Sequence, residues 1–471
     1  MLARARPYIF LFLGLTVLYH ANLRPIDSGD ALPGSLTPFS VVLDHTIVLD
    51  RFAPWLRGHV WYTSAVIHEA HGHFFSNFPI AGPLLVSPLY FPLAFLGRRE
   101  WDPALLVLVA RIAGKFAAAI VVALSAVLLL LLLKRLTTAR WAWRLTLVYA
   151  LATETWSISS QALWQHGPGE LALIGCFYCL QRWWEDRERH AWSWLCGACA
   201  AAAFVIRPTN VVLLPALVVA LLLAKTKLAD YVRLLAVPLV GGALLAGYNL
   251  YLFQRLSGGY AVAVLYGSAF PGLAGLFLSP GRGLLIYTPV VLFALGAFLP
   301  GASTARRKHK VLLEASVIFI ILESLVMSRS ISWWGGYSWG PRLLAELIPP
   351  LIVLMAIGVS AIDHVWPRRA FAVLAVYSVL IQAAGVFFYP NGHWDATPRS
   401  VDGAPARLWD WDDNPIARTL RGGFYREPYA VIGAALTQGL PAAQLRMRQL
   451  NVNPYEQAEP RKTPRADPGL P

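Results

Sequence analysis

The sequence predicts an all-α, polytopic membrane protein. Of its 471 residues, 57% are hydrophobic and only 14% are charged, whereas about 25% of the residues of soluble globular proteins are charged. The apolar residues gather in runs of about 20, the length that an α-helix needs to cross a bilayer. The Lys and Arg residues behind the net charge of +14 fall largely in short loops between these runs, where they set topology. We therefore expect no nucleic-acid partner.

The apolar runs predict about eleven membrane-spanning helices. They lie at 7–23, 108–133, 141–160, 168–184, 191–206, 209–224, 231–253, 283–299, 311–327, 342–361 and 369–388. The first run resembles the apolar part of a signal peptide, but the number of runs that follow favours a signal anchor. The chain shows no internal sequence repeat.

The basic loops predict the orientation of these helices. Loops rich in Lys and Arg stay in the cytoplasm, and such loops alternate here with loops that are much poorer in them. The basic loops are 134–144, 181–190, 225–233, 305–310 and 364–369. Placing them inside puts the long first loop, residues 24–105, outside the membrane together with the tail after Tyr389.

Residues 79–97 are apolar but contain four prolines. A full crossing here would invert every later loop and move all the basic loops outside. We therefore expect a re-entrant or interfacial helix at the outer surface, and the alternative is a twelve-span topology. The expected organisation is a membrane domain, residues 1–388, followed by an extracytoplasmic tail, residues 389–471, that is partly disordered.

The four cysteines form two CxxC pairs. Cys176 and Cys179 make the first pair, and Cys196 and Cys199 make the second, a spacing typical of zinc sites. Each pair lies in an apolar segment, where cysteine usually packs as a small apolar residue. We therefore favour a packing role, with a structural zinc site or a disulfide as the alternatives.

The stretch VIHEAHGHFF, residues 66–75, gathers three histidines around Glu69. The zinc-protease motif HExxH needs two histidines four residues apart on one face of a helix. The residue four after His68 is Gly72, which is a poor helix former. The spacing therefore argues against a metalloprotease, and the cluster is expected to lie in the first outer loop.

Short motifs occur in a definite order relative to the predicted helices. They are DSGD (27–30), SNFPIAGPLLVSPLY (76–90), LWQHGPGELAL (163–173), IRPTN (206–210), LSPGRGLLIYTPVVL (278–292) and WWGGYSWGPRLLAELIPPL (333–351). Each motif is weak alone, but their order is much more specific. In this order the chain resembles the GT-C class of membrane glycosyltransferases, which includes protein mannosyltransferases and bacterial lipid A aminoarabinose transferases.

The resemblance implies a GT-C-like helical bundle with a large first outer loop. It implies inverting transfer of a sugar from a polyprenyl-phosphate donor to a hydroxyl group of a glycan, lipid or protein, at the outer face of the bacterial cytoplasmic (inner) membrane. An acidic residue of the first outer loop is then the base, with Asp30 as first choice and Asp27 as second. No cofactor is required by the sequence. Some members of the class use a divalent metal ion, but DSGD is not a DxD motif and we predict no metal ligand.

Chemical reasoning from the residues supports the same roles. A hydroxyl is a poor nucleophile near neutral pH, and a carboxylate that takes its proton accelerates attack by about 10²–10⁴-fold. Arginine suits the donor phosphate because its planar fork binds two oxygens and stays charged. The candidates, each next to Gly or Pro at a predicted outer membrane edge, are Arg342, Arg282 and Arg207. The alternative for each is an arginine that snorkels to the membrane surface, and Arg207 has the further alternative of a structural pair with an Asp.

Six further residues are candidate contacts to the substrates. They are His71, His73, His166, Trp334, Tyr337 and Asp50. The alternatives are hydrated loop residues for those of the first outer loop, a structural helix-end histidine for the third, and an interfacial belt for the aromatic residues. Lys115 and Arg111, near the start of a predicted span, could also reach the outer phosphate zone, with helix-end anchors as their alternative.

A second function remains open at the level of sequence. The same outer cavity would also suit a non-enzymatic protein that binds or transports polyprenyl-phosphate sugars. Transporters usually show two related halves with interrupted helices, and such halves are not evident here. The acidic first outer loop followed by scattered arginines therefore favours the enzyme.

Overall fold

The structure is a computed structural model that describes residues 2–24, 26, 28–59, 65–96, 103–259, 265–362, 364–439, 441–442 and 445–446. The chain divides into two compact units, Met1–Gly423 and Phe424–Pro471. The second unit contains helix α20 (Glu427–Gln438). The predicted disordered end of the tail, residues 456–471, lies outside the described residues.

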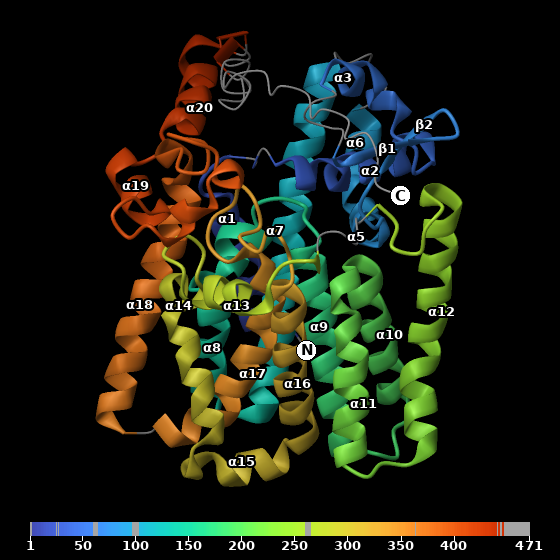
Figure 1. Ribbon diagram of the computed structural model, residues 1–471, viewed down its shortest axis with the longest axis vertical. Helices are drawn as coiled ribbons and strands as arrows, with labels where there is room; N and C mark the ends of the chain where they lie inside the picture. The colour runs from blue at the N-terminus through green and yellow to red at the C-terminus, as the bar shows by residue number, and fades with distance from the viewer. Residues whose placement is uncertain are drawn as a thin grey trace. The chain divides into compact units, whose positions relative to one another are not determined.

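Four helices in the described part of the chain are long and apolar enough to cross a membrane (Figure 1). They are α7 (Pro103–Leu136), α12 (Leu228–Phe253), α16 (Lys310–Ser328) and α18 (Val365–Phe387). A fifth span results if the apolar stretches Pro289–Phe298 and Pro300–Lys308, which are bent by 71°, are counted as one.

The other predicted runs form helices that are shorter, broken or more polar. They are α1 (Leu2–His20), α8 (Ala139–Leu151), α9 (His166–Glu185), α10 (Ala191–Ile206), α11 (Leu213–Leu223) and α17 (Ile348–Gly358). Proline has no backbone N–H and favours helix starts, and it opens the 3₁₀ stretches Pro208–Val212 and Pro289–Phe298. Helix α9 carries Glu170, Arg182 and Glu185. Apolar composition alone therefore predicts more long helices than the structure contains.

The helices pack side by side as a bundle (Figure 1). Helix α9 lies between α7 and α10, and α10 in turn packs against α12, while α16 contacts α11 and α17. Glycine allows one especially close approach: a Cβ at Gly197 of α10 would lie 2.4 Å from the carbonyl oxygen of Leu234 in α12. Small residues commonly permit such close packing between membrane helices.

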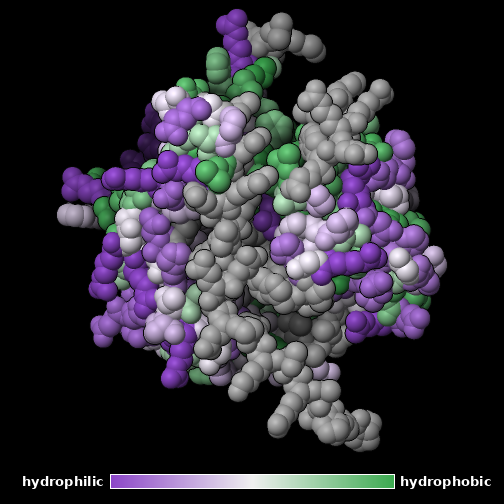
Figure 2. Space-filling model, turned by 90° about the horizontal axis from the view of Figure 1, so that it is seen from above, coloured by the Kyte–Doolittle hydropathy of each residue, from purple (hydrophilic) through white to green (hydrophobic). Residues whose placement is uncertain are grey.

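Large apolar side chains project from the sides of this bundle. The exposed fraction is 72% for Phe10 of α1, 72% for Leu239 and 71% for Leu244 of α12, and 63% for Leu380 of α18. Extensive apolar surface of this kind marks contact with membrane or protein. Hydrophilic residues are prominent on the face seen from above in Figure 2. The prediction of an all-α polytopic membrane protein is therefore confirmed, apart from one β-hairpin.

The segment that was predicted as the first outer loop, a name we keep for it, forms a series of short elements in its described residues. They are the 3₁₀ turn Gly29–Ala31, α2 (Leu32–Asp44), the 3₁₀ turn Asp50–Phe52, α3 (Ala53–Gly58), β1 (Ile67–Ala70), β2 (His73–Ser76), α5 (Ala81–Val86), the 3₁₀ turn Ser87–Tyr90 and α6 (Phe91–Leu96). The proline-rich segment from residue 79 to 97 thus forms short helices. Its apolar helical part, Ala81–Leu93, is too short to span a bilayer, as expected for an interfacial or re-entrant helix.

The stretch VIHEAHGHFF forms the antiparallel hairpin of β1 and β2. Ala70 pairs with His73, which leaves a two-residue turn. Both turn residues have positive φ, 53° for His71 and 79° for Gly72, as type I′ hairpin turns require. The zinc-protease motif needs two histidines on one face of a helix. Here the histidines lie on strands and in a turn instead, so the structure agrees with the argument against a metalloprotease.

The chain from Tyr389 to Gly423 belongs to the first unit. It contains the 3₁₀ turns Tyr389–Gly392, Val401–Gly403 and Pro405–Trp409 and helix α19 (Pro415–Gly422). Trp394 and Leu408 are fully buried. The first compact unit therefore includes the start of the predicted tail, because tertiary contacts hold a segment that has no long apolar run.

The five basic loops gather at one end of the bundle. The loop 305–310 begins within the short helix α15 (Ser303–Lys308). Arg135 forms a salt bridge with Glu185, and the indole N–H of Trp184 donates to the carbonyl oxygen of Lys308 at 3.2 Å. Lys310 donates to the carbonyl oxygen of Leu223 at 3.0 Å. We call this the basic end, and it lies at the bottom of Figure 1.

The four cysteines lie where α9 packs against α10. All are free thiols, and the sulfurs of Cys176 and Cys196 are 3.5 Å apart. A Cβ at Gly175 would lie 3.0 Å from the sulfur of Cys199. The cysteines thus fill the tight interface between the two helices.

Candidate active site

Asp30 and Arg342, the first choices for base and phosphate ligand, are in direct contact. An Arg342 Nη1–H donates to Oδ2 of Asp30 at 2.6 Å. The Asp30 side chain is 46% exposed and that of Arg342 is 12% exposed. A carboxylate open to solvent therefore lies against a largely buried guanidinium.

The loop before Arg342 aims this guanidinium. Its other terminal nitrogen donates to the carbonyl oxygen of Gly335 at 2.6 Å, and its carbon lies 4.6 Å from the ring centre of Trp164. Gly335 has φ of +72° and Gly340 has φ of +63°, a region that suits glycine. The glycines of WWGGYSWGPR thus shape the loop that orients Arg342.

Asp30 is positioned by the turn that leads into α2. The hydroxyl of Ser35 donates to the carbonyl oxygen of Ala31 at 3.2 Å, and Ala31 and Leu32 are buried. A Cβ at Gly114 of α7 would lie 2.2 Å from the Ser35 hydroxyl. The close packing of α2 on α7 therefore anchors the turn and leaves only the Asp30 side chain exposed.

A second cluster of charges lies one helical turn beyond Arg342. Glu346 belongs to the same 3₁₀ stretch, Arg342–Leu347. Its carboxylate lies 3.1 Å from Nη1 of Arg207 and 3.0 Å from Nδ1 of His166. All three side chains are at most 7% exposed. Arg207 is thus paired with a glutamate, and His166 contacts the same carboxylate.

This buried cluster extends to two further residues. Nε of Arg207 donates to the hydroxyl of Thr209 at 3.0 Å. Glu323 of α16 is fully buried and lies within electrostatic reach of Arg207. Ionisable side chains inside a membrane bundle are costly and mark functional sites by default. The cluster is joined to the Asp30–Arg342 pair through the 3₁₀ stretch that carries both Arg342 and Glu346.

Lys115 contributes another buried cation, near the start of the first outer loop. Its ammonium group donates to Oδ1 of Asn22 and to the carbonyl oxygen of Arg24. Asn22 in turn donates to Gln161 at 2.8 Å. Lys115 is thus a tether between α7 and the segment that leads to Asp30. The neighbouring cation Arg111 lies over the Trp55 ring at 5.6 Å.

Arg282, predicted as a phosphate ligand, is fully buried and bonded to the protein. It donates to the carbonyl oxygens of Trp334 at 3.2 Å, Gly281 at 2.9 Å and Gly336 at 3.2 Å, and it forms a salt bridge with Asp395. Its side chain has an exposure of 0%, so in this conformation its partners are groups of the protein itself.

Trp334 and Tyr337, predicted as stacking residues, contact the segment after α18. The indole N–H of Trp334 donates to Asp402 at 2.8 Å, and the Tyr337 hydroxyl lies 2.5 Å from that of Ser400. Trp334 is only 7% exposed. These contacts join the segment from Tyr389 to Gly423 to the loop that precedes Arg342.

His71, His73 and Asp50 make contacts within the outer loop and with α12. Asp50 accepts from His73 Nδ1 at 2.6 Å and from the Phe74 N–H at 2.9 Å. The His71 ring stacks on Tyr251 with centroids 5.1 Å apart. Partial burial raises the pKa of Asp50, but the hydrogen bonds of His73 and Phe74 outweigh it, so that pKa is below its ordinary value. These contacts stabilise the hairpin.

Glu346, Trp164 and Glu323 are site residues that the sequence analysis missed. Acidic residues in apolar runs are a usable signal, and both glutamates sit in such runs, LLAELIPPL and VIFIILESLV. The stacking of Trp164 on Arg342 depends on tertiary structure and has no such signal. Asp27, the second candidate base, lies outside the described residues.

The described residues contain no group of three or more His, Cys, Asp or Glu side chains arranged to hold a metal ion. Two ion pairs form the site: Arg342 pairs with Asp30, and Arg207 pairs with Glu346. The first pair is partly exposed to solvent and the second is buried.

The fold and this site define the class of the chain as a polytopic helical membrane protein with a charged site at the end of the bundle away from the basic loops. No protein-family model and no curated protein matches the chain. Among solved structures, it is similar to ArnT from Cupriavidus metallidurans bound to undecaprenyl phosphate, with 16% identity, a TM-score of 0.48, and coverage of 95% of this chain and 78% of that one. For ArnT from the same organism in the apo state the values are 15%, 0.49, 94% and 75%.

Proposed function

We propose that the protein is an inverting glycosyltransferase that moves a sugar from a polyprenyl-phosphate donor to a hydroxyl acceptor. The observation that carries the proposal is the contact of 2.6 Å between the exposed carboxylate of Asp30 and the guanidinium of Arg342. A base for the acceptor and a ligand for the leaving phosphate are the two groups that such a transfer needs. The order of the sequence motifs supports the same class, GT-C.

In the proposed reaction Asp30 takes the proton of the acceptor hydroxyl. The acceptor oxygen forms a bond to the anomeric carbon while the bond from that carbon to the phosphate oxygen breaks, so configuration inverts. The polyprenyl phosphate leaves with the electron pair. Positive charge placed where anionic charge develops is commonly the largest catalytic contribution, and Arg342 is the group placed to supply it.

The ion pair supplies a simple way to couple donor binding to activation of the base. A donor phosphate that binds Arg342 replaces the Asp30 carboxylate as its partner. Asp30 is then released to accept a hydrogen bond from the acceptor. Arg342 keeps its contacts with Gly335 and Trp164 during this exchange, so its orientation is retained.

Glu346 and Arg207 are positioning residues in this scheme. Glu346 lies on the stretch that begins with Arg342. Its pair with Arg207 joins that stretch to the 3₁₀ turn Pro208–Val212, which precedes α11. Because misplacement of a reacting group by about 1 Å can cost a factor of about 10², this anchoring matters for the alignment of Arg342.

The proposed location is the cytoplasmic membrane of a bacterium, with the site on the outer face. Clustering of the basic loops at the end of the bundle away from Asp30 supports this orientation under the positive-inside rule. The proposed partners are the polyprenyl-phosphate sugar and a glycan, lipid or protein that offers a hydroxyl group.

The test is mass spectrometry of lipid-linked sugars and surface glycans in a deletion strain. The proposal expects a polyprenyl-phosphate sugar to accumulate, wild-type complementation to clear it, and Asp30→Asn to fail. The control is Asp44→Asn, because Asp44 of the same loop pairs with Arg51 at the surface. An unchanged pool of lipid-linked sugars in the deletion strain would contradict the transferase. Binding of the donor by the purified protein, together with surface glycans that are unchanged in the deletion strain, would favour the binding or transport protein.

A further inference from the structure

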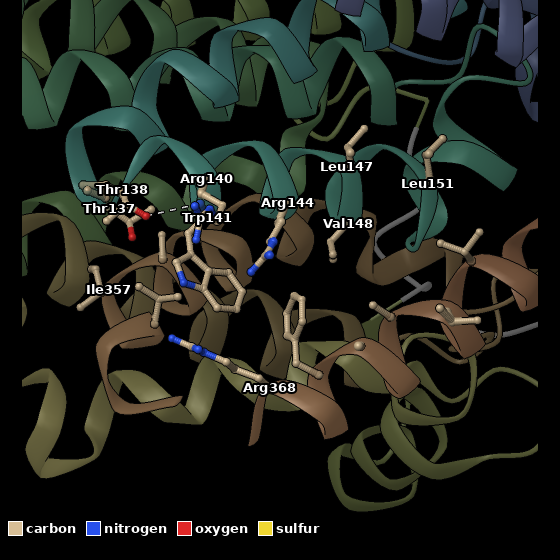
Figure 3. Close-up of a pocket in the computed structure, with 18 of the residues that line it drawn as sticks. Thr137, Thr138, Arg140, Trp141, Arg144, Leu147, Val148, Leu151, Ile357 and Arg368 are labelled. Atoms are coloured by element: carbon tan, nitrogen blue, oxygen red, sulfur yellow. Dashed lines mark hydrogen bonds between the residues drawn. The ribbon is translucent and has the colours of Figure 1, made fainter. Parts of the chain in front are cut away.

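A cavity of about 1260 Å³ lies at the basic end. It is bounded by α8, the far end of α17 and the part of α18 from Arg368 to Leu380 (Figure 3). Pockets for drug-sized ligands measure about 300–1,000 Å³. A cavity of this size suits a larger molecule than a single sugar or nucleotide.

One wall of the cavity is apolar and open to the side of the bundle. It includes Leu147, Phe371, Val376 and Leu380. The exposed fraction is 44% for Leu147, 60% for Val376 and 63% for Leu380. Since the side of the bundle faces lipid, an acyl chain can enter this groove without leaving an apolar environment.

Three arginines, which we call the arginine rim, line the part of the cavity nearest the starts of α8 and α18. Arg140, Arg144 and Arg368 line the cavity together with the hydroxyl residues Thr137 and Thr138, and the labelled side chains show this cationic group around Trp141 (Figure 3). None of the described residues that line the cavity is acidic.

The placement of Arg140 and Arg144 indicates an anionic occupant. They are four residues apart on α8, where like charges destabilise a helix. Arg144 lies over the Trp141 ring at 5.0 Å, and that ring contacts Phe371 edge-on at 5.3 Å. The arginine rim is therefore in contact, through Trp141, with the apolar wall.

The cavity is separate from the proposed active site. Arg342 begins the helical stretch that runs through α17 to Val359, which lines the cavity. At about 1.5 Å per residue this stretch places the two sites roughly 25 Å apart. The phosphate of a donor held by Arg342 therefore cannot occupy the arginine rim.

We propose that this cavity binds an anionic glycerophospholipid from the leaflet at the basic end. The headgroup phosphate lies among Arg140, Arg144 and Arg368, with the threonine hydroxyls as donors, and an acyl chain follows the wall from Leu147 to Leu380. Basic pockets between membrane helices bind anionic headgroups in this way. The occupant ties α8 to α18 across a groove that protein side chains leave open.

The test is native mass spectrometry of the full-length protein in neutral detergent, titrated with dioleoyl phosphatidylglycerol or with dioleoyl phosphatidylcholine. The proposal expects selective retention of phosphatidylglycerol. The variant Arg140→Gln/Arg144→Gln/Arg368→Gln should lower its affinity by about a hundredfold, from about fivefold for each arginine. Free glycerol phosphate at millimolar concentration should not displace the lipid, because it lacks the acyl chains.

The matched control removes the same charge elsewhere at the basic end. Arg189→Gln/Arg307→Gln/Lys308→Gln changes exposed residues that do not line the cavity, and it should retain phosphatidylglycerol. Leu147→Trp, at an exposed position, fills the groove and should reduce binding while all charges remain. It keeps the proposal testable if the triple variant fails to fold.

Four results would overturn the proposal. Equal retention of phosphatidylglycerol by the triple variant would show that the arginines do not bind it, and equal loss by the control would show an effect of net charge alone. Displacement by a polyprenyl phosphate would assign the groove to the donor lipid. Conversion of a wild-type dimer to monomer by Leu147→Trp, without lipid binding, would assign it to a second copy of the chain.

Discussion

Asp30 and Arg342 are 312 residues apart in the sequence, and a hydrogen bond of 2.6 Å joins them. Asp30 is nearly half exposed, and solvent-exposed ion pairs contribute only about 0–1 kcal/mol. Exchange of the carboxylate for a donor phosphate therefore costs little. The fixed part of the arrangement is Arg342, which Gly335 and Trp164 hold from two other directions.

Asp30→Asn should abolish transfer while donor binding survives. The amide cannot take a proton from the acceptor, so kcat should fall by about 10²–10⁴-fold. Binding of the polyprenyl-phosphate donor should be equal or stronger, because Arg342 loses its competing carboxylate. Single-turnover transfer and donor binding, measured on one detergent-purified sample, separate the two effects. Wild-type turnover by Asp30→Asn would remove this residue from the reaction.

Arg342→Lys should weaken the use of the donor even though the charge is kept. A lysine is a point charge without the planar fork, and each hydrogen bond to a charged group is worth about 1.5–3 kcal/mol. We expect the donor KM to rise by about 10–100-fold. Arg51→Lys is the control, since Arg51 forms a surface pair with Asp44 in the outer loop. A donor KM that is equally raised in both variants would argue against a specific phosphate contact.

Much of the site could be predicted because the relevant residues stand at edges of apolar runs. Asp30 and Arg342 are charged residues beside turn-forming glycines, and membrane edges are where such groups meet lipid phosphates. The buried Glu346 had a signal too, as an acidic residue in an apolar run. The salt bridge of Arg282 had no such signal, because its partner Asp395 lies 113 residues away in a segment that has no long apolar run.

The fold was predictable at the level of class and less so at the level of single helices. Long runs such as that of α7 form the expected spanning helices. The run 209–224, which follows Pro208, and the run 283–299, which contains Pro289, break into 3₁₀ and α segments, because proline removes a backbone hydrogen bond. The hairpin of residues 67–76 was missed, because its turn residues, His71 and Gly72, are not one of the usual hairpin pairs such as Asn-Gly or Asp-Gly.

Glu346→Ala should destabilise the folded protein. It leaves the buried Arg207 without its carboxylate partner at 3.1 Å, and breaking a buried pair in this way costs about 3–5 kcal/mol. The double variant Arg207→Met/Glu346→Leu should recover much of this loss, because no charge remains buried. Thermal unfolding in detergent measures both. A single variant as stable as the wild type would show that water or another residue compensates Arg207.

The hairpin of the outer loop should loosen at acidic pH. The pKa of Asp50 is lowered in the folded state by its contacts with His73 and Phe74, so its contribution to stability is present above the ordinary pKa, about 3.9. That contribution is lost as the pH falls through the lowered pKa. The protection of the Phe74 amide, which donates to Asp50 at 2.9 Å, against hydrogen exchange should fall in that range, relative to the intrinsic exchange rate at each pH. Asp50→Asn should show no such loss of protection, and the same pH response in that variant would assign it to another group.

Arg282→Met distinguishes a structural arginine from a phosphate ligand. The side chain is fully buried and bonded to Trp334, Gly281 and Gly336, so its removal leaves the carbonyl groups of Trp334 and Gly336 without this donor. It also takes the cation away from the buried carboxylate of Asp395, which keeps a hydrogen bond from the hydroxyl of Tyr389. An uncompensated buried charge costs about 3–5 kcal/mol, and we expect a large loss of thermal stability with an unchanged donor KM in the folded fraction. Adding Asp395→Leu should restore part of the stability. If Arg282→Met instead folds like the wild type and raises the donor KM as Arg342→Lys does, the donor phosphate reaches Arg282 during the reaction, and the loop of residues 334–336 must open to admit it.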